Sequence, residues 1–275
     1  MNEAKRARMV RWLQGEGIEI GALHQPLAVP AGVRVTYVDH LPDADLKTMY
    51  DDIADKPFAP VSIIAGAEDL SPIADRSQDF VIANHLLEHL EDPVRGLLEF
   101  GRVLKPDGVL YLALPDKRQS FDRDRDLTPA EEILEDHRRG PERSRQSHYA
   151  DWARHVDKVT EAEIAARVEH ILATGYSIHF HVWRPETFLE FFLAARREFE
   201  LDFDLAEIAL PEHENDDEFI LILLKGRTEH ARFAPVPIPA ARPVPAPAVQ
   251  RLKKKVLATP LGPPLRAVRR RLRRG

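Results

Sequence analysis

Short apolar runs recur along the first part of the chain, and the stretches between them carry helical spacing. Each run is about 4–7 residues long and apolar on both faces, which is typical of strands buried in a parallel sheet. The runs are Ile18–Gly21, Val33–Asp39, Val61–Ile64, Gln78–Asn84 and Val109–Leu114. Runs that alternate with helices in this way predict an α/β fold, in which a mostly parallel sheet has helices on both faces.

The segments between these strands differ in what they predict. Apolar spacing predicts a helix over Val94–Leu104 and a crossover helix over Asp45–Ile53. Pro26 and Pro30 stand where the first crossover helix would begin, so we expect that helix to be short or distorted. The Lys105–Gly108 segment contains Pro-Asp-Gly and predicts a turn.

The regular alternation stops after Pro115. Residues 116–182 are rich in charge and predict helical segments on either side of Gly140-Pro141. An insertion of this size after the fifth strand predicts a helical lid over the ligand. Thr160 and Glu163 have the spacing of a capping box, which predicts the start of another helix.

The domain is predicted to close with a β-hairpin. A helix over 183–196 precedes an alternating segment, Phe199–Leu205, and a final apolar strand, Glu218–Lys225. These two strands bring the predicted sheet to seven. We expect this domain to span 1–226, followed by a Pro/Ala-rich linker at 227–250 and a disordered basic tail at 251–275.

Composition restricts the kinds of stabilising site and the cellular location that we expect for the protein. The chain has 275 residues, 44% hydrophobic, and no cysteine, so neither a disulfide framework nor a thiolate metal site is possible. The N-terminal segment has no apolar run of signal-peptide length, and we expect a cytoplasmic protein.

Charge is divided unevenly along the chain. Ten of the 39 basic residues lie in 251–275, which contains no acidic residue, whereas the other 29 share the body with all 45 acidic residues. The acidic body would repel nucleic acid, so no nucleic-acid partner is expected. The tail combines Lys and Arg with apolar residues, and we expect either peripheral contact with the anionic inner membrane face or a solubilising role.

The first turn distinguishes two classes of nucleotide ligand. A dinucleotide requires a turn with several glycines against its pyrophosphate, but only Gly21 follows the first strand here. S-adenosylmethionine carries an ammonium and a sulfonium in place of phosphates, so Glu19 beside one glycine suits it better. Asp39, at the end of the second strand, can accept hydrogen bonds from ribose hydroxyls of either ligand.

Further motifs resemble the class I S-adenosylmethionine-dependent methyltransferases of the type 11 kind. These motifs are Glu19-Ile20-Gly21, Ala67-Glu68-Asp69-Leu70, Ser77–Leu90, Asp92-Pro93 and Arg102–Gly108, in this order. Pro115-Asp116-Lys117-Arg118 and His179-Phe180-His181-Val182-Trp183 resemble a bacterial subgroup associated with methylation of surface glycans or secondary metabolites. The resemblance implies a Rossmann-like fold and S-adenosylmethionine as methyl donor.

Site roles follow from the same resemblance. It implies that Glu19, Gly21 and Ala22 line the methionine end of the donor, and that Asp39 holds the ribose. Ala67 and Glu68 would flank the adenine, and Asn84 and His85 would face the reacting methyl group. Leu23-His24 replaces the usual second glycine, and Gly66 replaces an acid that often precedes the Ala67-Glu68 pair, so we expect the adenine to be held through backbone or Glu68.

Methyl transfer to oxygen or nitrogen requires a group that removes the proton of the acceptor, and a neutral histidine suits this role near pH 7. The candidate bases are His85, His148, His179 and His181, with Asp116 as a carboxylate alternative. His179 and His181 would point the same way on an extended segment, but two histidines are too few for a metal site, so no metal is predicted. A structural role in the lid is the competing interpretation for both.

Other charged residues have plainer interpretations. The segment Asn84–His89 begins a helix, and His89, one of its later members, is expected to pack or cap there. The Asp122–Asp126 run is expected to be solvated unless its arginines hold an anionic acceptor. The predicted function is O-methylation of a sugar, glycan or secondary metabolite. Two alternatives are an NAD(P)-dependent oxidoreductase, which the chain disfavours by lacking a Tyr-x-x-x-Lys pair, and a non-catalytic adapter recruited to the membrane by its tail.

Overall fold

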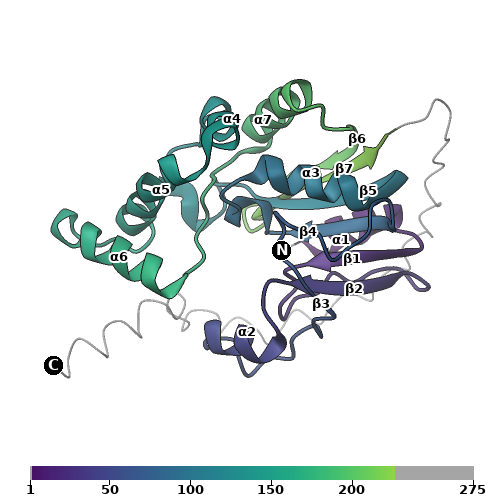
Figure 1. Ribbon diagram of the computed structural model, residues 1–275, viewed down its shortest axis with the longest axis horizontal. Helices are drawn as coiled ribbons and strands as arrows, with labels where there is room; N and C mark the ends of the chain where they lie inside the picture. Colours follow the sequence, from purple (N-terminus) through teal and green to yellow (C-terminus); the bar gives the residue numbers. More distant parts are fainter. Residues whose placement is uncertain (1, 227–275) are drawn as a thin grey trace, which may run out of the picture.

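The computed structural model describes residues 2–226, which form a seven-stranded sheet with helices on both faces (Figure 1). The strand order is β3-β2-β1-β4-β5-β7-β6. The strands are β1 (Glu16–Ile20), β2 (Arg34–Asp39), β3 (Ile63–Ile64), β4 (Gln78–Asn84), β5 (Leu104–Pro115), β6 (Phe203–Ala209) and β7 (Glu218–Lys225). Strands β1 to β5 pair in parallel, and β7 is antiparallel to both β5 and β6. The predicted mostly parallel Rossmann-like sheet with a closing hairpin is confirmed.

Strand side chains alternate between two cores, one on each face of the sheet. Val81 and Ala83 of β4 pack with α3 and α7, whereas Phe80 and Ile82 pack with Met9 of α1. This is the two-residue period of a strand buried on both sides. The longer helices of the domain are α1 (Glu3–Met9), α2 (Asp43–Met49), α3 (Pro93–Val103), α4 (Ala130–Arg139), α5 (Glu142–His155), α6 (Ile164–Thr174) and α7 (Pro185–Glu198).

The structure differs from local predictions at the first crossover, at the start of β5 and at the start of β6. No helix forms between β1 and β2, because Pro26 and Pro30 interrupt the segment and its Leu27 amide donates to the Glu19 carboxylate. The predicted turn at Lys105–Gly108 is already part of β5, whose Leu104 pairs with Gln78 of β4. The edge strand β6 begins at Phe203, since Phe199 still caps α7.

The insertion after β5 folds as helices. Helices α4 and α5 lie on either side of Gly140-Pro141, as predicted, and the capping box of Thr160 and Glu163 is formed at the start of η4 (Glu161–Glu163), which leads into α6. Helices α5 and α6 enclose a core of their own, which contains Trp152. In Figure 1 they lie beside the sheet, on the left. Residues of α5 line a cavity together with residues from the ends of β1 and β2 and with His85, which follows β4.

The predicted linker at 227–250 and basic tail at 251–275 lie outside the described residues. Within residues 2–226, no helix is both long enough and apolar enough to cross a membrane.

Candidate functional site

Two cavities meet at the carboxyl ends of the parallel strands. The larger, about 830 Å³, reaches from the β2 end to the lid, and the smaller, about 280 Å³, lies at the β1 turn. Gly21, Leu23 and His85 line both cavities. Ligands of open α/β sheets bind at the carboxyl ends of the strands, at the point where the strand order reverses, which is between β1 and β4 here. The larger cavity is also lined by Asp39, Ala67 and Glu68, and the smaller by Glu19, Ala22 and Asn84.

The turn after β1 bends sharply without the usual second glycine. Gly21 has a φ of 71°, and Leu23 takes a φ of 47°, in the left-handed region that non-glycine residues seldom adopt. The Gly21 amide donates to the Val38 carbonyl at 3.0 Å, which ties the turn to the end of β2. The single glycine therefore suffices for this turn, because Leu23 takes the second left-handed position.

Glu19 is fully buried at the floor of the smaller cavity. Its carboxylate accepts hydrogen bonds from the Leu27 amide at 3.0 and 3.1 Å and from Nδ2 of Asn84 at 3.1 Å. Burial raises the pKa of Glu19 to about 7, against the opposing effect of these donors. The carboxyl group is therefore poised to ionise when a cation binds beside it.

Asp39 ends β2 and lines the larger cavity. Its Oδ1 accepts both the backbone amide and Nδ1 of His40, each at 2.8 Å. Both bonds fall on one oxygen and hold the carboxylate in a single orientation. This arrangement can present the other oxygen to ribose hydroxyls.

The loop after β3 places Ala67 and Glu68 on the opposite wall of the same cavity. Glu68 accepts the Asp92 amide at 3.0 Å, and its carbonyl accepts Nε of Arg95 at 2.8 Å. Burial, assisted by the charges of Asp92 and Glu91, raises the pKa of Glu68. The loop is thus fixed by α3, and both backbone and carboxyl of Glu68 are near the predicted adenine position.

His85 follows β4 and has a φ of 47°. Its Nε2 lies 3.0 Å from Oε2 of Glu218, and its Nδ1 lies 3.6 Å from Oε1 of Glu88. Burial opposes the imidazolium, but the hydrogen bond to Glu218 and the charge of Glu88 outweigh it, so the pKa of His85 is raised. Arg6 donates two further hydrogen bonds to Glu218, at 2.8 and 2.6 Å.

Asp116 and His148 do not line either cavity. Asp116 is fully buried and accepts hydrogen bonds from the guanidinium of Arg118, its neighbour two residues on. His148 is buried on α5, and burial lowers its pKa to about 4. Neither side chain lies among the residues that surround the predicted donor position.

His179 and His181 both face α5 from the segment before α7. The His179 ring lies 5.9 Å from Trp152, and the His181 ring lies 5.6 Å from His148. His181 stacks on Trp183, and burial lowers its pKa to about 3. The two histidines therefore share a side of the chain, as the spacing predicts, but neither lines the larger or the smaller cavity.

The predicted solvated run at Asp122–Asp126 is wrong for two of its members. Asp122 and Arg125 are buried and joined by a 2.8 Å ion pair, and Arg125 also bonds Asp151 at 2.6 Å. The Arg125 guanidinium is therefore occupied by Asp122 and Asp151 and does not face an anionic acceptor. Packing against distant segments of the chain decides which residues of this run are buried, and the local charge pattern does not show it.

Glu218, Arg6 and Glu88 were not predicted as part of the site. Glu218 opens β7, and the antiparallel register pairs it with Pro115 at the end of β5. An antiparallel strand thus brings its first residue to the edge where the parallel strands end. The sequence signal for Glu218 is an acid at the start of a strand whose next six residues are apolar.

Known proteins resemble part of this chain. Residues 15–112 match the methyltransferase-domain family. The demethylmenaquinone methyltransferase of Chlorobaculum tepidum is 32% identical over 120 residues, which are 41% of this chain and 46% of that protein. An uncharacterized protein of Methanocaldococcus jannaschii is 29% identical over 135 residues, which are 44% of this chain and 62% of that protein. The alignments therefore span about half the length of these relatives.

Solved structures show similarity over more of the chain. A Thermotoga maritima S-adenosylmethionine-dependent methyltransferase, described as a possible histamine N-methyltransferase, has 18% identity and a TM-score of 0.43 over 81% of this chain and 88% of its own. A Rhodobacter sphaeroides structure described as a candidate zinc-dependent alcohol dehydrogenase has 13% identity and a TM-score of 0.50, over 82% and 91%. At such identities these likenesses concern the fold alone. Residues 15–112 therefore carry the methyltransferase domain that the motifs predict, and they belong to the seven-stranded sheet described above.

Proposed function

We propose that this chain transfers a methyl group from S-adenosylmethionine to a hydroxyl oxygen of a sugar, glycan or secondary metabolite in the cytoplasm. The observation that carries the proposal is the position of His85, which lines both cavities. The smaller cavity fits the methionine end of the donor, and the larger offers room for its nucleoside and for an acceptor. His85 stands between them, where the methyl group would be transferred.

The donor has a complementary partner at each end. The ammonium can pair with Glu19 across the smaller cavity, the ribose with Asp39, and the adenine with the Ala67-Glu68 loop. Gly21 keeps the intervening backbone close to the ligand. The positive charge of S-adenosylmethionine matches a turn with one glycine and a buried carboxylate better than a pyrophosphate would.

His85 is the proposed general base. Methyl transfer is an in-line displacement in which the acceptor oxygen attacks the methyl carbon while the carbon–sulfur bond breaks. The proton of the hydroxyl passes to His85, and the Glu218 carboxylate at 3.0 Å stabilises the imidazolium that forms. Alignment of the two reactants supplies the rest of the rate gain.

The remaining wall of the larger cavity supports a hydroxylated acceptor. It combines the side chains of Arg145, Glu142 and Tyr149 from the start and middle of α5 with Tyr176 and Phe180. Such a mixture of aromatic surface and a few charged groups is typical of sites for polar small molecules. Because this wall belongs to the insertion, the lid residues are the ones expected to select the acceptor.

The two alternatives differ in what they bind. An oxidoreductase would bind NAD(H), and a non-catalytic adapter would bind neither nucleotide. Titration of the purified chain with S-adenosylmethionine, S-adenosylhomocysteine and NADH separates the three: binding of the first two alone is expected, NADH binding alone would support the oxidoreductase, and no binding would support the adapter. Donor labelled on its methyl group, offered with hydroxylated sugars, then tests the acceptor class, and His85→Asn should lower turnover about 10²–10⁴-fold.

A further inference from the structure

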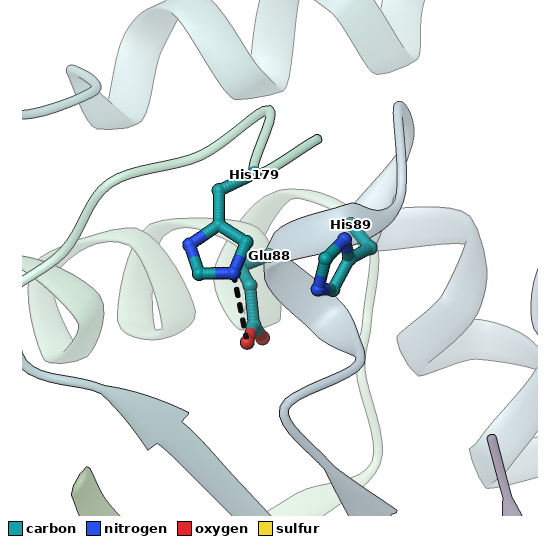
Figure 2. A group of neighbouring side chains, drawn as sticks. All are labelled: Glu88, His89 and His179. Atoms are coloured by element: carbon teal, nitrogen blue, oxygen red, sulfur yellow. Dashed lines mark ion pairs between the residues drawn. The ribbon is translucent and has the colours of Figure 1, made fainter. Parts of the chain in front are cut away.

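A cluster of two imidazoles and one carboxylate lies beneath the larger cavity, beside the proposed base. Glu88 and His89 belong to the short helix η2 (Leu87–His89), and His179 comes from the segment before α7 (Figure 2). One ligand atom from each lies within 4.8 Å of the others. We propose that Glu88, His89 and His179 bind a divalent first-row transition-metal ion.

Backbone hydrogen bonds build this cluster from distant parts of the chain. The amides of Phe180 and His181 donate to the Glu88 carbonyl at 2.7 and 3.2 Å. These bonds fix the segment that carries His179 against η2. The juxtaposition of these two segments therefore belongs to the packed fold.

Both imidazoles are held through Nδ1, which leaves Nε2 for an ion. Nδ1 of His179 lies 2.7 Å from Oδ2 of Asp122, itself paired with Arg125, and Nδ1 of His89 lies 2.9 Å from Oγ of Ser177. Metal-binding histidines characteristically donate their other N–H to a carboxylate or similar acceptor, which orients the ring. Asp122 and Ser177 stand in these supporting positions.

Glu88 provides a second, independent observation. Its side chain is fully buried, and among residues 2–226 neither carboxylate oxygen has a hydrogen-bond partner. A buried carboxylate without donors is costly unless a cation neutralises it. The nearest basic atoms are Nδ1 of His85 at 3.6 Å and Nε2 of His179 at 3.9 Å, the latter marked in Figure 2. A metal ion between these groups would satisfy Glu88.

The ligand set indicates the kind of ion. Two imidazoles and a carboxylate suit zinc, cobalt, nickel or iron, whereas calcium and magnesium prefer oxygen ligands throughout. A zinc ion with bonds of about 2.1 Å holds its ligand atoms about 3.4 Å apart, whereas the present atoms lie up to 4.8 Å apart, so the side chains must close by up to about 1.4 Å on binding. Three protein ligands leave a position open, and His89 lines the larger cavity. His181, the partner of His179 in the sequence pattern, is not in the cluster.

Metal binding can be measured without any methyl acceptor. The untagged full chain is stripped with a chelator and titrated with Co²⁺, followed by visible absorbance, and with Zn²⁺, followed by calorimetry. We expect one tight ion per chain. Glu88→Gln, His89→Asn and His179→Asn should each weaken it at least 100-fold, and the supporting variant Asp122→Asn about 10–100-fold. The surface variant His170→Ala should leave affinity unchanged.

Absence of a tight ion in the unaltered chain would overturn the proposal, as would an ion whose affinity is the same in all three ligand variants. Circular dichroism identifies any variant that fails to fold. If the ligand variants do not fold, the metal affinities of the unaltered chain and of Asp122→Asn are compared instead. A rise in the melting temperature of the stripped chain on Zn²⁺ addition, lost in folded ligand variants, is the supporting result. Binding of S-adenosylhomocysteine to stripped protein is measured alongside, so failure of the metal site is distinguishable from failure of the proposed function.

Discussion

The Nδ2 atom of Asn84 donates a 3.1 Å hydrogen bond to Oε1 of Glu19, which joins the last residue of β4 to the carboxylate of β1. These two strands are neighbours in the sheet, and their carboxyl ends form the floor of the smaller cavity. The amide of Asn84 holds the buried carboxylate in place without neutralising it. The proton on Glu19 is thus available for exchange with a cationic ligand.

Donor binding should depend on pH through Glu19. Because burial raises its pKa to about 7, the group is largely protonated at pH 6, and an ammonium ligand must displace that proton. Affinity for S-adenosylhomocysteine should therefore rise as pH increases from 5.5 to 7.5, by up to about tenfold per pH unit below the pKa. Calorimetry in buffers of different ionisation enthalpy would detect the released proton.

The variant Glu19→Gln provides the control for this effect. It keeps the shape of the side chain but cannot ionise, so binding should be weak at every pH and the pH dependence should disappear. If the affinity of the variant for S-adenosylhomocysteine rose with pH as steeply as that of the unaltered chain, another group would be responsible for the pH dependence. In the protein without ligand, ionisation of Glu19 should also lower the free energy of unfolding as pH rises from about 4.5 to about 7, because the pKa of Glu19 is higher in the folded than in the unfolded state.

Asp39 is predicted to hold the ribose. Asp39→Asn keeps an acceptor for His40 but removes the charge that pairs with two hydroxyls, and affinity for S-adenosylhomocysteine should fall about 10–100-fold, since charge-assisted hydrogen bonds contribute about 1.5–3 kcal/mol. Asp45→Asn, an exposed acid on α2, is the matched control and should bind normally. Unchanged affinity in Asp39→Asn would exclude Asp39 from the donor site.

Glu218 is predicted to stabilise the folded protein. Its hydrogen bonds with Arg6 and His85 outweigh its burial and hold its pKa at about 2, below that of an unfolded chain. The stabilisation is present above pH 4.5 and is lost as pH falls toward 2; the shift corresponds to about 3 kcal/mol. Glu218→Gln should lower the free energy of unfolding in urea by about 3–5 kcal/mol at pH 7, because it leaves Arg6 unpaired.

The comparison variant for Glu218 is Glu212→Gln, whose exposed ion pair with Arg8 should contribute less than about 1 kcal/mol. The difference in free energy of unfolding between the unaltered chain and Glu218→Gln should become smaller below pH 4.5. A loss that stays constant down to pH 3 would mean that packing, and not charge, accounts for the effect.

The basic tail is expected either to contact anionic membrane or to act as a solubilising segment. Deletion of 234–275 should abolish co-flotation with liposomes that contain phosphatidylserine, because each basic residue near such a surface contributes about 1 kcal/mol. Neutral liposomes are the control and should not bind either form. Equal flotation of the full and truncated chains would end the membrane hypothesis, and absence of flotation by both would leave the solubilising role.

Much of the fold could be predicted because its signals are local. The extents of β4 and β7 agree with the runs at Gln78–Asn84 and Glu218–Lys225, since the central part of a strand buried on both faces is continuously apolar. Boundaries at β6 and at the start of β5 were missed. At those places pairing with a neighbouring strand, and not the composition of the segment, decides where the strand begins.

The sequence by itself determined the order of strands and helices, and it placed Glu19, Asp39 and Asn84 at strand ends, because parallel strands bring their carboxyl ends to one edge. Only the tertiary structure decided which partners those residues meet. Glu218 reaches His85 because β7 runs antiparallel beside β5, and His179 reaches Glu88 because two amides of its segment bind the Glu88 carbonyl. Contacts between residues so far apart depend on strand register and lid packing, for which local periodicity carries no signal.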